Sequence, residues 1–198
     1  MFSSFFKSYF IGISTLLIIS IIFCSFIPSV FPNSKFKATY IDAITTIISD
    51  GTFSWPTPGY NTITSPFGKR SAPTSGASTF HSGVDIGAPA WSNIVAVCSG
   101  RVTFLGFSGA GGFTITITGD TFTTSYCHVS PDFIVYVGQN IKQGQAIGKV
   151  GPKNVYGVPN NPYKDTSGNP TNGATTGPHL HLTIRKDGKL VNPLDYIS

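Results

Sequence analysis

All four histidines of the chain stand in contexts that could serve a metal centre; they are His81, His128, His179 and His181. The most informative pair is His179 and His181, in the sequence His-Leu-His-Leu-Thr-Ile. On a β-strand alternate side chains share a face, so both imidazoles would project from one side, about 7 Å apart, while the alternating apolar residues pack into the core. One imidazole could then bind a metal and the other act beside it as an acid or base. A pair of solvent-facing histidines explains this motif alone equally well.

A second element pairs His81 with Asp85. The four-residue offset would place both side chains on one face of a helix, but Gly83, Gly87 and Pro89 disfavour a helix and favour an extended segment and turn that lead into a strand. One histidine, one carboxylate and a later histidine make a three-ligand set, which leaves a fourth position for water, as in catalytic zinc sites. Taken alone, the pair is more typical of a hydrogen-bonded surface contact.

His128 ends a third element that reads as a strand. Alternation predicts that Thr124, Tyr126 and His128 share one face, with Cys127 and Val129 on the other. A lone histidine on a strand is usually structural, so His128 gains weight only from the rest of the set.

The order of several motifs resembles the lysostaphin-type (LytM-like) zinc endopeptidases, whose hallmarks are His-x3-Asp and a terminal His-x-His. The resemblance covers about residues 55 to 195 and is specific because all of the motifs occur in the family's order. The segments that carry it are Ser65–Arg70, His81–Ile86, Tyr126–Ser130, Gly138–Gly148 and Gly177–His181.

The resemblance implies a role for each of five residues. His81, Asp85 and His181 would ligate one zinc ion, and His128 and His179 would be the catalytic pair. The family cleaves peptide stems or cross-links of bacterial peptidoglycan, so the resemblance implies a zinc metalloendopeptidase with that substrate. The intact set favours activity over the alternative, a non-catalytic wall-binding or regulatory envelope module with the same fold. A role beside a secretion or conjugation apparatus, in which the peptidase opens the wall locally, is compatible with both.

The elements that would position these residues are short strands. The segment 113–118 alternates apolar and polar residues, Gly119-Asp120 reads as a hairpin turn, and 122–128 returns as a second strand. With the resemblance, this predicts a mainly β domain, a compact antiparallel sheet with the site in a groove floored by the sheet. The long segment 152–178 departs from the family's shorter turns, and with Tyr156 and Tyr163 it would form either a wall of the groove or a solvent loop.

The N-terminal part has a different character. Residues 9–31 form an apolar run without charge, about 23 residues long and enough to cross a hydrocarbon core of about 30 Å as a helix. No Ala-x-Ala-like cleavage site follows, which favours an uncleaved anchor over a signal peptide. We therefore expect a cytoplasmic stub and transmembrane helix over 1–34, a helical spacer over 35–52 and the peptidase domain over 53–198.

Localisation follows from the expected substrate. We expect a single-pass protein of the bacterial cell membrane with the catalytic domain outside the cytoplasm, although Lys35 and Lys37 outnumber Lys7 and so lean the other way. The net charge of +5 suits an anionic partner, and the absence of a run of Lys or Arg disfavours nucleic acid. Cys98 and Cys127 lie in strand-like runs and are expected to pack as small buried residues, although a disulfide outside the cytoplasm is not excluded by sequence.

Overall fold

The computed structural model describes residues 53–198, so the predicted anchor at 9–31 and the predicted spacer at 35–52 lie outside the described residues. Within 53–198, no helix has the length and apolar character needed to span a membrane. The strands are β1 (Thr62–Ser65), β2 (Gly68–Lys69), β3 (Phe80–His81), β4 (Val84–Gly87), β5 (Asn93–Val95), β6 (Gly100–Phe107), β7 (Phe113–Thr118), β8 (Phe122–Cys127), β9 (Asn140–Ile141), β10 (Ala146–Lys149), β11 (Leu180–Lys186) and β12 (Lys189–Val191). Two short 3-10 helices, η1 (Gly109–Gly111) and η2 (Pro193–Asp195), complete the elements of this part.

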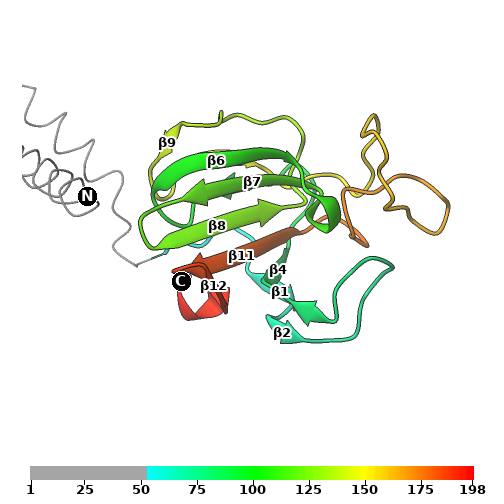
Figure 1. Cartoon of the computed structure of the whole chain (residues 1–198), viewed down its shortest axis with the longest axis horizontal. Coiled ribbons are helices and arrows are strands. Elements are labelled where there is room, and N and C mark those ends of the chain that lie inside the picture. The colour runs from blue at the N-terminus through cyan, green and yellow to red at the C-terminus, as the bar shows by residue number, and fades with distance from the viewer. Residues whose placement is uncertain (1–52) are drawn as a thin grey trace, which may run out of the picture. The chain divides into compact units, whose positions relative to one another are not determined.

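Eight of the strands form one antiparallel sheet (Figure 1). Its order is β1-β4-β11-β8-β7-β6-β9, and β12 pairs with the far end of β11. The last long strand, β11, therefore lies between β4 and β8, strands that precede it by about 100 and about 60 residues. This non-consecutive order brings the His81–Asp85 segment beside the His-x-His strand, and it confirms the prediction of a mainly antiparallel β domain.

The centre of the sheet follows the predicted alternation. β7 and β8 form the expected hairpin, in which Ile115 lies opposite Tyr126 and Ile117 opposite Thr124. In β11 the residues Leu180, Leu182 and Ile184 are fully buried, as predicted from their spacing. Burying a side chain of this size contributes about 1.5–3 kcal/mol to stability, so this face fixes the register of the strand.

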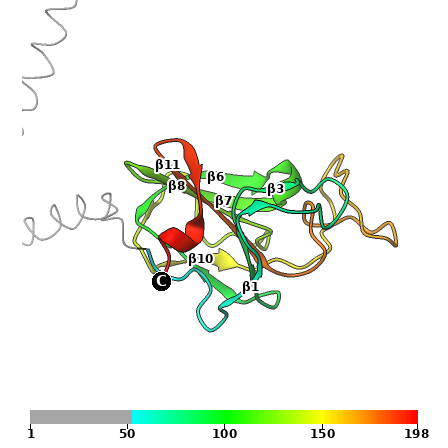
Figure 2. The same ribbon diagram turned by 90° about the horizontal axis from the view of Figure 1, so that it is seen from below.

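A second, smaller layer covers the apolar face of the sheet (Figure 2). β5 and β10 pair with each other as a two-stranded ribbon. Gly148 of β10 lies so close to Ile115 that a Cβ added to the glycine would come within 2.9 Å of the isoleucine side chain. The core therefore lies between the sheet and the β5–β10 ribbon, and the opposite face of the sheet is left to the loops that build the site.

The segment between β3 and β4 is the turn that the glycines predicted. Gly83 sits where a Cβ would collide with the backbone carbonyl of Leu182, so only glycine allows β4 to approach β11 this closely. The segments 66–80 and 152–178 leave the sheet at the same end (Figure 1), and both extend beside the His-x-His end of β11.

Candidate metal centre

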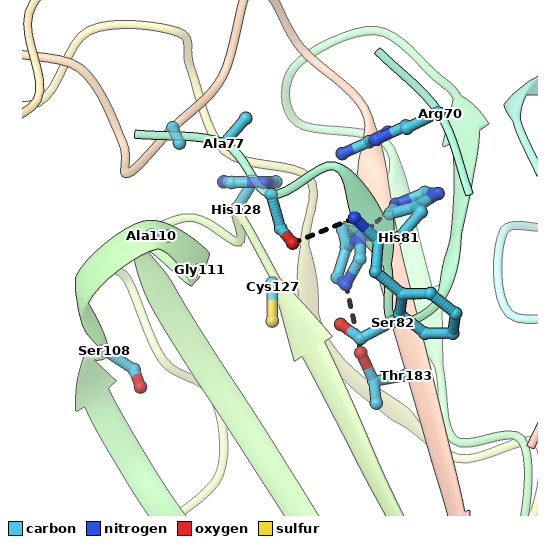
Figure 3. Close-up of a pocket in the computed structure, with 14 residues that line it drawn as sticks. Arg70, Ala77, His81, Ser82, Ser108, Ala110, Gly111, Cys127, His128 and Thr183 are labelled. Atoms are coloured by element: carbon cyan, nitrogen blue, oxygen red, sulfur yellow. Dashed lines mark hydrogen bonds between the residues drawn. The ribbon is translucent and has the colours of Figure 1, made fainter. Parts of the chain in front are cut away.

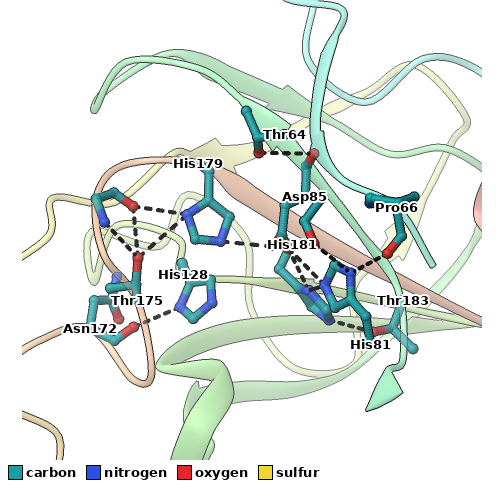
Figure 4. Close-up of polar contacts among 12 residues, drawn as sticks. Thr64, Pro66, His81, Asp85, His128, Asn172, Thr175, His179, His181 and Thr183 are labelled. Atoms are coloured by element: carbon teal, nitrogen blue, oxygen red, sulfur yellow. Dashed lines mark hydrogen bonds and ion pairs between the residues drawn. The ribbon is translucent and has the colours of Figure 1, made fainter. Parts of the chain in front are cut away.

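Strand pairing brings the three predicted ligands together. Asp85 of β4 lies directly opposite His181 of β11, and His81 ends β3 just before the turn into β4. Oδ1 of Asp85 lies 3.0 Å from Nε2 of His81 and 2.8 Å from Nδ1 of His181. The two imidazole nitrogens are 2.9 Å apart. Three potential ligand atoms thus converge on one point (Figure 4), all within 4.8 Å of one another.

The outer nitrogens of the two imidazoles have their own partners. Nδ1 of His81 lies 2.7 Å from the carbonyl oxygen of Pro66, which can only accept, so Nδ1 carries the proton and Nε2 presents a lone pair. Nε2 of His181 lies 3.0 Å from the hydroxyl of Thr183, which can accept its proton and leave Nδ1 as the inward lone pair. Two imidazole lone pairs and a carboxylate oxygen directed at one point repel each other unless a cation lies between them. The donor set therefore fits zinc, which binds imidazole and carboxylate ligands.

The carboxylate of Asp85 stays ionised in this setting. Burial by itself raises the pKa of the Asp85 carboxyl. In the metal-free site, hydrogen bonds that His181 and His81 donate when they carry a proton on the facing nitrogen, together with the nearby charge of His179, outweigh burial and hold the pKa far below the ordinary value. The second carboxylate oxygen, Oδ2, accepts a hydrogen bond from the Arg70 guanidinium at 3.2 Å. A permanently charged carboxylate is the form that binds a cation.

His128 corrects one prediction of the strand alternation. It follows the end of β8 with a left-handed φ of 57°, which reverses the direction of its side chain. Tyr126 accordingly packs in the core, where its hydroxyl accepts a hydrogen bond from Val97 N at 2.8 Å, while His128 lies with Cys127 on the side of the metal centre. The prediction that Tyr126 and His128 share a face is therefore wrong, because the strand geometry on which it rests ends one residue earlier.

The buried imidazole of His128 is oriented by the long loop. Nδ1 donates to the backbone carbonyl of Asn172 at 2.6 Å, so Nε2 is left unprotonated. The side chain of Asn172 is itself fixed, because it accepts from Phe113 N at 2.8 Å and donates to the Val129 carbonyl at 3.0 Å. Burial lowers the pKa of His128 to about 3, helped by the nearby charges of His179 and His181. His128 is therefore neutral at physiological pH.

His179 is held in the same way by a second carbonyl of that loop. Its Nδ1 donates to the Gly177 carbonyl at 2.8 Å, and the Thr175 hydroxyl lies 3.4 Å from the same nitrogen. Its Nε2 faces the metal centre, 3.6 Å from Oδ1 of Asp85. The rings of His128 and His179 are 4.7 Å apart between centroids, so the two imidazoles lie side by side next to the three candidate ligands (Figure 4).

Two cavities meet at this centre. The first, of about 240 Å³, lies over the sheet between the 77–82 segment and η1, with Cys127 and Thr183 among its lining residues (Figure 3). The second, of about 420 Å³, lies toward the start of β11. Both are lined by Arg70, His128, Ala174 and His181. Because they share these lining residues, the two cavities together form a groove beside the metal centre.

The long loop forms one wall of this groove, but not through the residues that the sequence suggested. Residues 174 and 176–178 line the second cavity, whereas Tyr156 and Tyr163 line neither. Tyr156 is mostly exposed, and the ring of Tyr163 lies against Gly76. The loop is also bonded internally, since Asp165 accepts from Ser167 N and Asn169 N. The wall is therefore a structured segment in which small residues, rather than aromatic ones, face the site.

Comparison with known proteins agrees with this geometry. Residues 79–163 match peptidase family M23. The protein contains an M23 peptidase domain. Mpg, a DD-carboxypeptidase/endopeptidase of Neisseria meningitidis, is 33% identical over 136 residues, which cover 68% of this chain and 27% of Mpg. The family match confirms the resemblance to lysostaphin-type peptidases.

Two further proteins are similar to this chain. The murein hydrolase activator NlpD of Escherichia coli is 29% identical over 149 residues, covering 74% of this chain and 31% of NlpD. A crystal structure of a zinc-containing peptidase from Vibrio cholerae superposes with a TM-score of 0.55 and 27% identity, covering 71% of this chain and 39% of that one. The chain thus spans about a quarter to a third of the length of Mpg and NlpD.

Several groups in the site of the M23 domain had no signal in the sequence. The carbonyls of Pro66, Asn172 and Gly177 orient three of the histidines, and a backbone carbonyl carries no residue type to recognise. Arg70 belongs to the family-like segment Ser65–Arg70, but nothing in that segment indicates a contact with Asp85. The five predicted site residues are all brought together, and their supports come from loops whose folded course sequence patterns do not reveal.

Proposed function

We propose that this protein is a zinc-dependent metalloendopeptidase that hydrolyses peptide bonds in bacterial peptidoglycan. The observation that carries the proposal is the convergence of His81, Asp85 and His181 on one point, with His128 and His179 beside it, each bound to a loop carbonyl through Nδ1. Membership of peptidase family M23 and the similarity to Mpg, which is named as an endopeptidase, support the reaction class.

The donor set suggests a separate role for the metal ligands and for the two remaining imidazoles. His81, Asp85 and His181 would hold the zinc ion, which would supply Lewis-acid chemistry by polarising the scissile carbonyl and making water a nucleophile near neutral pH. Because Nδ1 of His128 and of His179 is bound to a carbonyl, Nε2 of each imidazole is the atom available for proton transfer. One imidazole accepts the proton of the attacking water and returns it to the leaving amine, and the other donates a hydrogen bond to the oxyanion once it is protonated.

The acid and base must be imidazoles in this site. Of the described residues that line the two cavities, Asp85 alone carries a carboxylate, and Asp85 is a candidate ligand. The glutamate base of helical His-Glu-x2-His zinc peptidases therefore has no counterpart along this groove. Burial keeps His128 neutral at physiological pH, so its Nε2 presents a lone pair, which is the form that a base requires.

The decisive experiment measures zinc content and hydrolysis together. The full chain, purified in detergent and supplied with zinc, is incubated with peptidoglycan, and newly formed amino groups are quantified with and without a chelator. We expect about one zinc ion per chain and chelator-sensitive release. His128→Ala and His179→Ala should abolish release and keep zinc, whereas Asp85→Asn should lose zinc. Loss of zinc in either histidine variant would show that the roles are assigned wrongly.

The same experiment tests the alternative that the similarity to NlpD raises. A folded protein that binds zinc but releases no amino groups from several peptidoglycan types would favour a regulatory module, in keeping with the name of NlpD as a murein hydrolase activator. A folded protein that binds no zinc would refute the proposal itself.

We also propose that residues 9–31 anchor the protein in the bacterial cell membrane with the peptidase domain outside the cytoplasm. The support is the length and apolar character of that segment and the location of the proposed substrate. Protease added to intact spheroplasts should degrade the domain while spheroplast integrity is preserved. Protection of the domain until the membrane is disrupted would refute this orientation.

A further inference from the structure

The segment Ser65–Arg70 resembles the family in sequence, yet neither the ligand set nor the catalytic pair includes it. In the fold it joins β1 to β2 and continues beside the metal centre. Nη1 of Arg70 donates to Asp85 Oδ2 at 3.2 Å and to Ser65 Oγ at 2.6 Å. Both protons of this nitrogen are therefore committed, one to a candidate ligand and the other to a hydroxyl that holds the guanidinium in place.

The contact with Arg70 gives the two oxygens of the Asp85 carboxylate different partners. Oδ1 faces Nε2 of His81 and Nδ1 of His181, at 3.0 and 2.8 Å, whereas Oδ2 is occupied by the guanidinium. The same segment supplies the Pro66 carbonyl that fixes the proton of His81 on Nδ1. One short stretch of chain thus orients two of the three candidate ligands, and it does so from outside the ligand set.

Two physical effects of Arg70 oppose each other. Its positive charge repels a bound cation, which weakens metal affinity. Its hydrogen bond prevents rotation of the carboxylate and so removes an entropic cost of binding, which strengthens metal affinity. The side chain of Arg70 is 80% buried, and its Nε is buried without a hydrogen-bond partner. Burying a charge in this way costs desolvation free energy, which neutralising the charge of Asp85 would not by itself explain.

We propose that Arg70 is a positioning residue that holds Asp85 so that a single oxygen faces the metal, and that it thereby tightens zinc binding. This inference rests on the proposed zinc site. Groups that orient metal ligands from outside the ligand set typically change metal affinity or activity about 10–100-fold when they are replaced. We expect the orienting effect to outweigh the repulsion, because the positive charge of Arg70 is already paired with the carboxylate.

The test compares metal binding in three variants of the full chain. Zinc affinity is measured by competition with a chromophoric chelator, in the absence of peptidoglycan. Arg70→Gln should weaken zinc binding about 10–100-fold. Arg70→Lys, which keeps a donor and the charge but not the planar fork, should recover part of the loss. The matched control is Lys69→Gln, which removes the same charge from an exposed neighbouring residue and should leave affinity unchanged.

A second readout reports on coordination rather than affinity. Cobalt(II) bound in place of zinc absorbs visible light more strongly in four-coordinate than in five-coordinate sites. Arg70→Gln frees Oδ2 of Asp85 to bind as well, so the cobalt form of this variant should absorb more weakly than that of the wild-type protein. A variant that is merely less stable would show the wild-type spectrum for its bound fraction.

The outcomes separate this inference from the function on which it rests. Wild-type protein that binds no zinc would refute the proposed zinc site. Wild-type protein that binds zinc, with Arg70→Gln binding it equally well or more tightly and with an unchanged cobalt spectrum, would overturn the role of Arg70 alone. Equal losses in Arg70→Gln and Lys69→Gln would show that the effect does not come from the contact between Arg70 and Asp85, and would also overturn it.

Discussion

The buried imidazole of His128 predicts a specific dependence of stability on pH. Its pKa is lowered from about 6.5 to about 3 by burial, assisted by the charges of His179 and His181. Between these two values the unfolded chain binds a proton at His128 that the folded chain does not bind, so acidification stabilises the unfolded state. The stability contributed by a neutral His128 is complete above pH 6.5 and is lost as the pH falls toward 3. Lowering the pH to 5.0 covers 1.5 pH units of this window, which corresponds to about 2 kcal/mol.

The measurement is urea unfolding of the metal-free full chain at pH 7.5 and 5.0, with a chelator present because zinc binding itself depends on pH. Tryptophan fluorescence is a suitable signal, since Trp55 packs against the core. The reference variant is His128→Asn, whose amide can still donate to the Asn172 carbonyl but does not titrate. We expect its loss of stability between the two pH values to be smaller than that of the wild-type protein by about 2 kcal/mol.

Other titrating groups do not confound this difference. His181 also has a lowered pKa, in its case chiefly through burial, so it contributes in the same direction, but equally in both proteins. The pKa of Asp85 is lowered as well, and the stability that this carboxylate contributes is lost only below its unfolded value of about 3.8, outside the window. Equal pH dependence in wild type and variant would refute the reasoning, because it would mean that the imidazole of His128 is hydrated and titrates normally.

Three further variants test the supports of the site and of the core. Asn172→Ala should greatly reduce peptidoglycan hydrolysis with zinc affinity unchanged, because it removes the side chain that fixes the carbonyl bound to His128. The control is Asn169→Ala, at an exposed position of the same loop. Gly173→Ala should have the same effect on turnover with an added loss of stability in urea unfolding, because Gly173 has a φ of 75° and a Cβ there would collide with the backbone of η1. Tyr126→Phe should leave turnover intact and destabilise the fold by about 1–3 kcal/mol in urea, because the buried N–H of Val97 loses its acceptor.

Local patterns in the sequence predicted the parts of the fold that depend on neighbouring residues. The alternation in β7 and β11 and the turn at Gly119-Asp120 each follow from side chains within a few positions, and the structure confirms all three. The placement of β11 between β4 and β8 depends instead on pairing across long separations. No periodicity in the sequence encodes that neighbour relation, so the order of these strands was not predicted; the family resemblance implied only that His81, Asp85 and His181 share one zinc site.

His128 illustrates the limit of the local patterns. Its residue type marked it as a candidate, but alternation assigned it to the face of Tyr126, which lies in the core. A left-handed backbone conformation at a histidine is uncommon, and the residues before His128 do not indicate that its side chain will point to the opposite face. The conformation is stabilised only in the folded protein, where the Asn172 carbonyl accepts the Nδ1 proton and His128 N donates to the Gly111 carbonyl.

Two of the candidate metal ligands are held by strands of the sheet, whereas the two catalytic candidates are held by the long loop. Asp85 and His181 lie on neighbouring strands of the central sheet, where the ladder fixes their distance. The two catalytic candidates, His128 and His179, are instead oriented by carbonyls at Asn172 and Gly177, both within the segment 152–178. A change in this loop can therefore alter proton transfer without altering the metal ligands. The segment 152–178 is thus in a position to set the rate of the proposed hydrolysis.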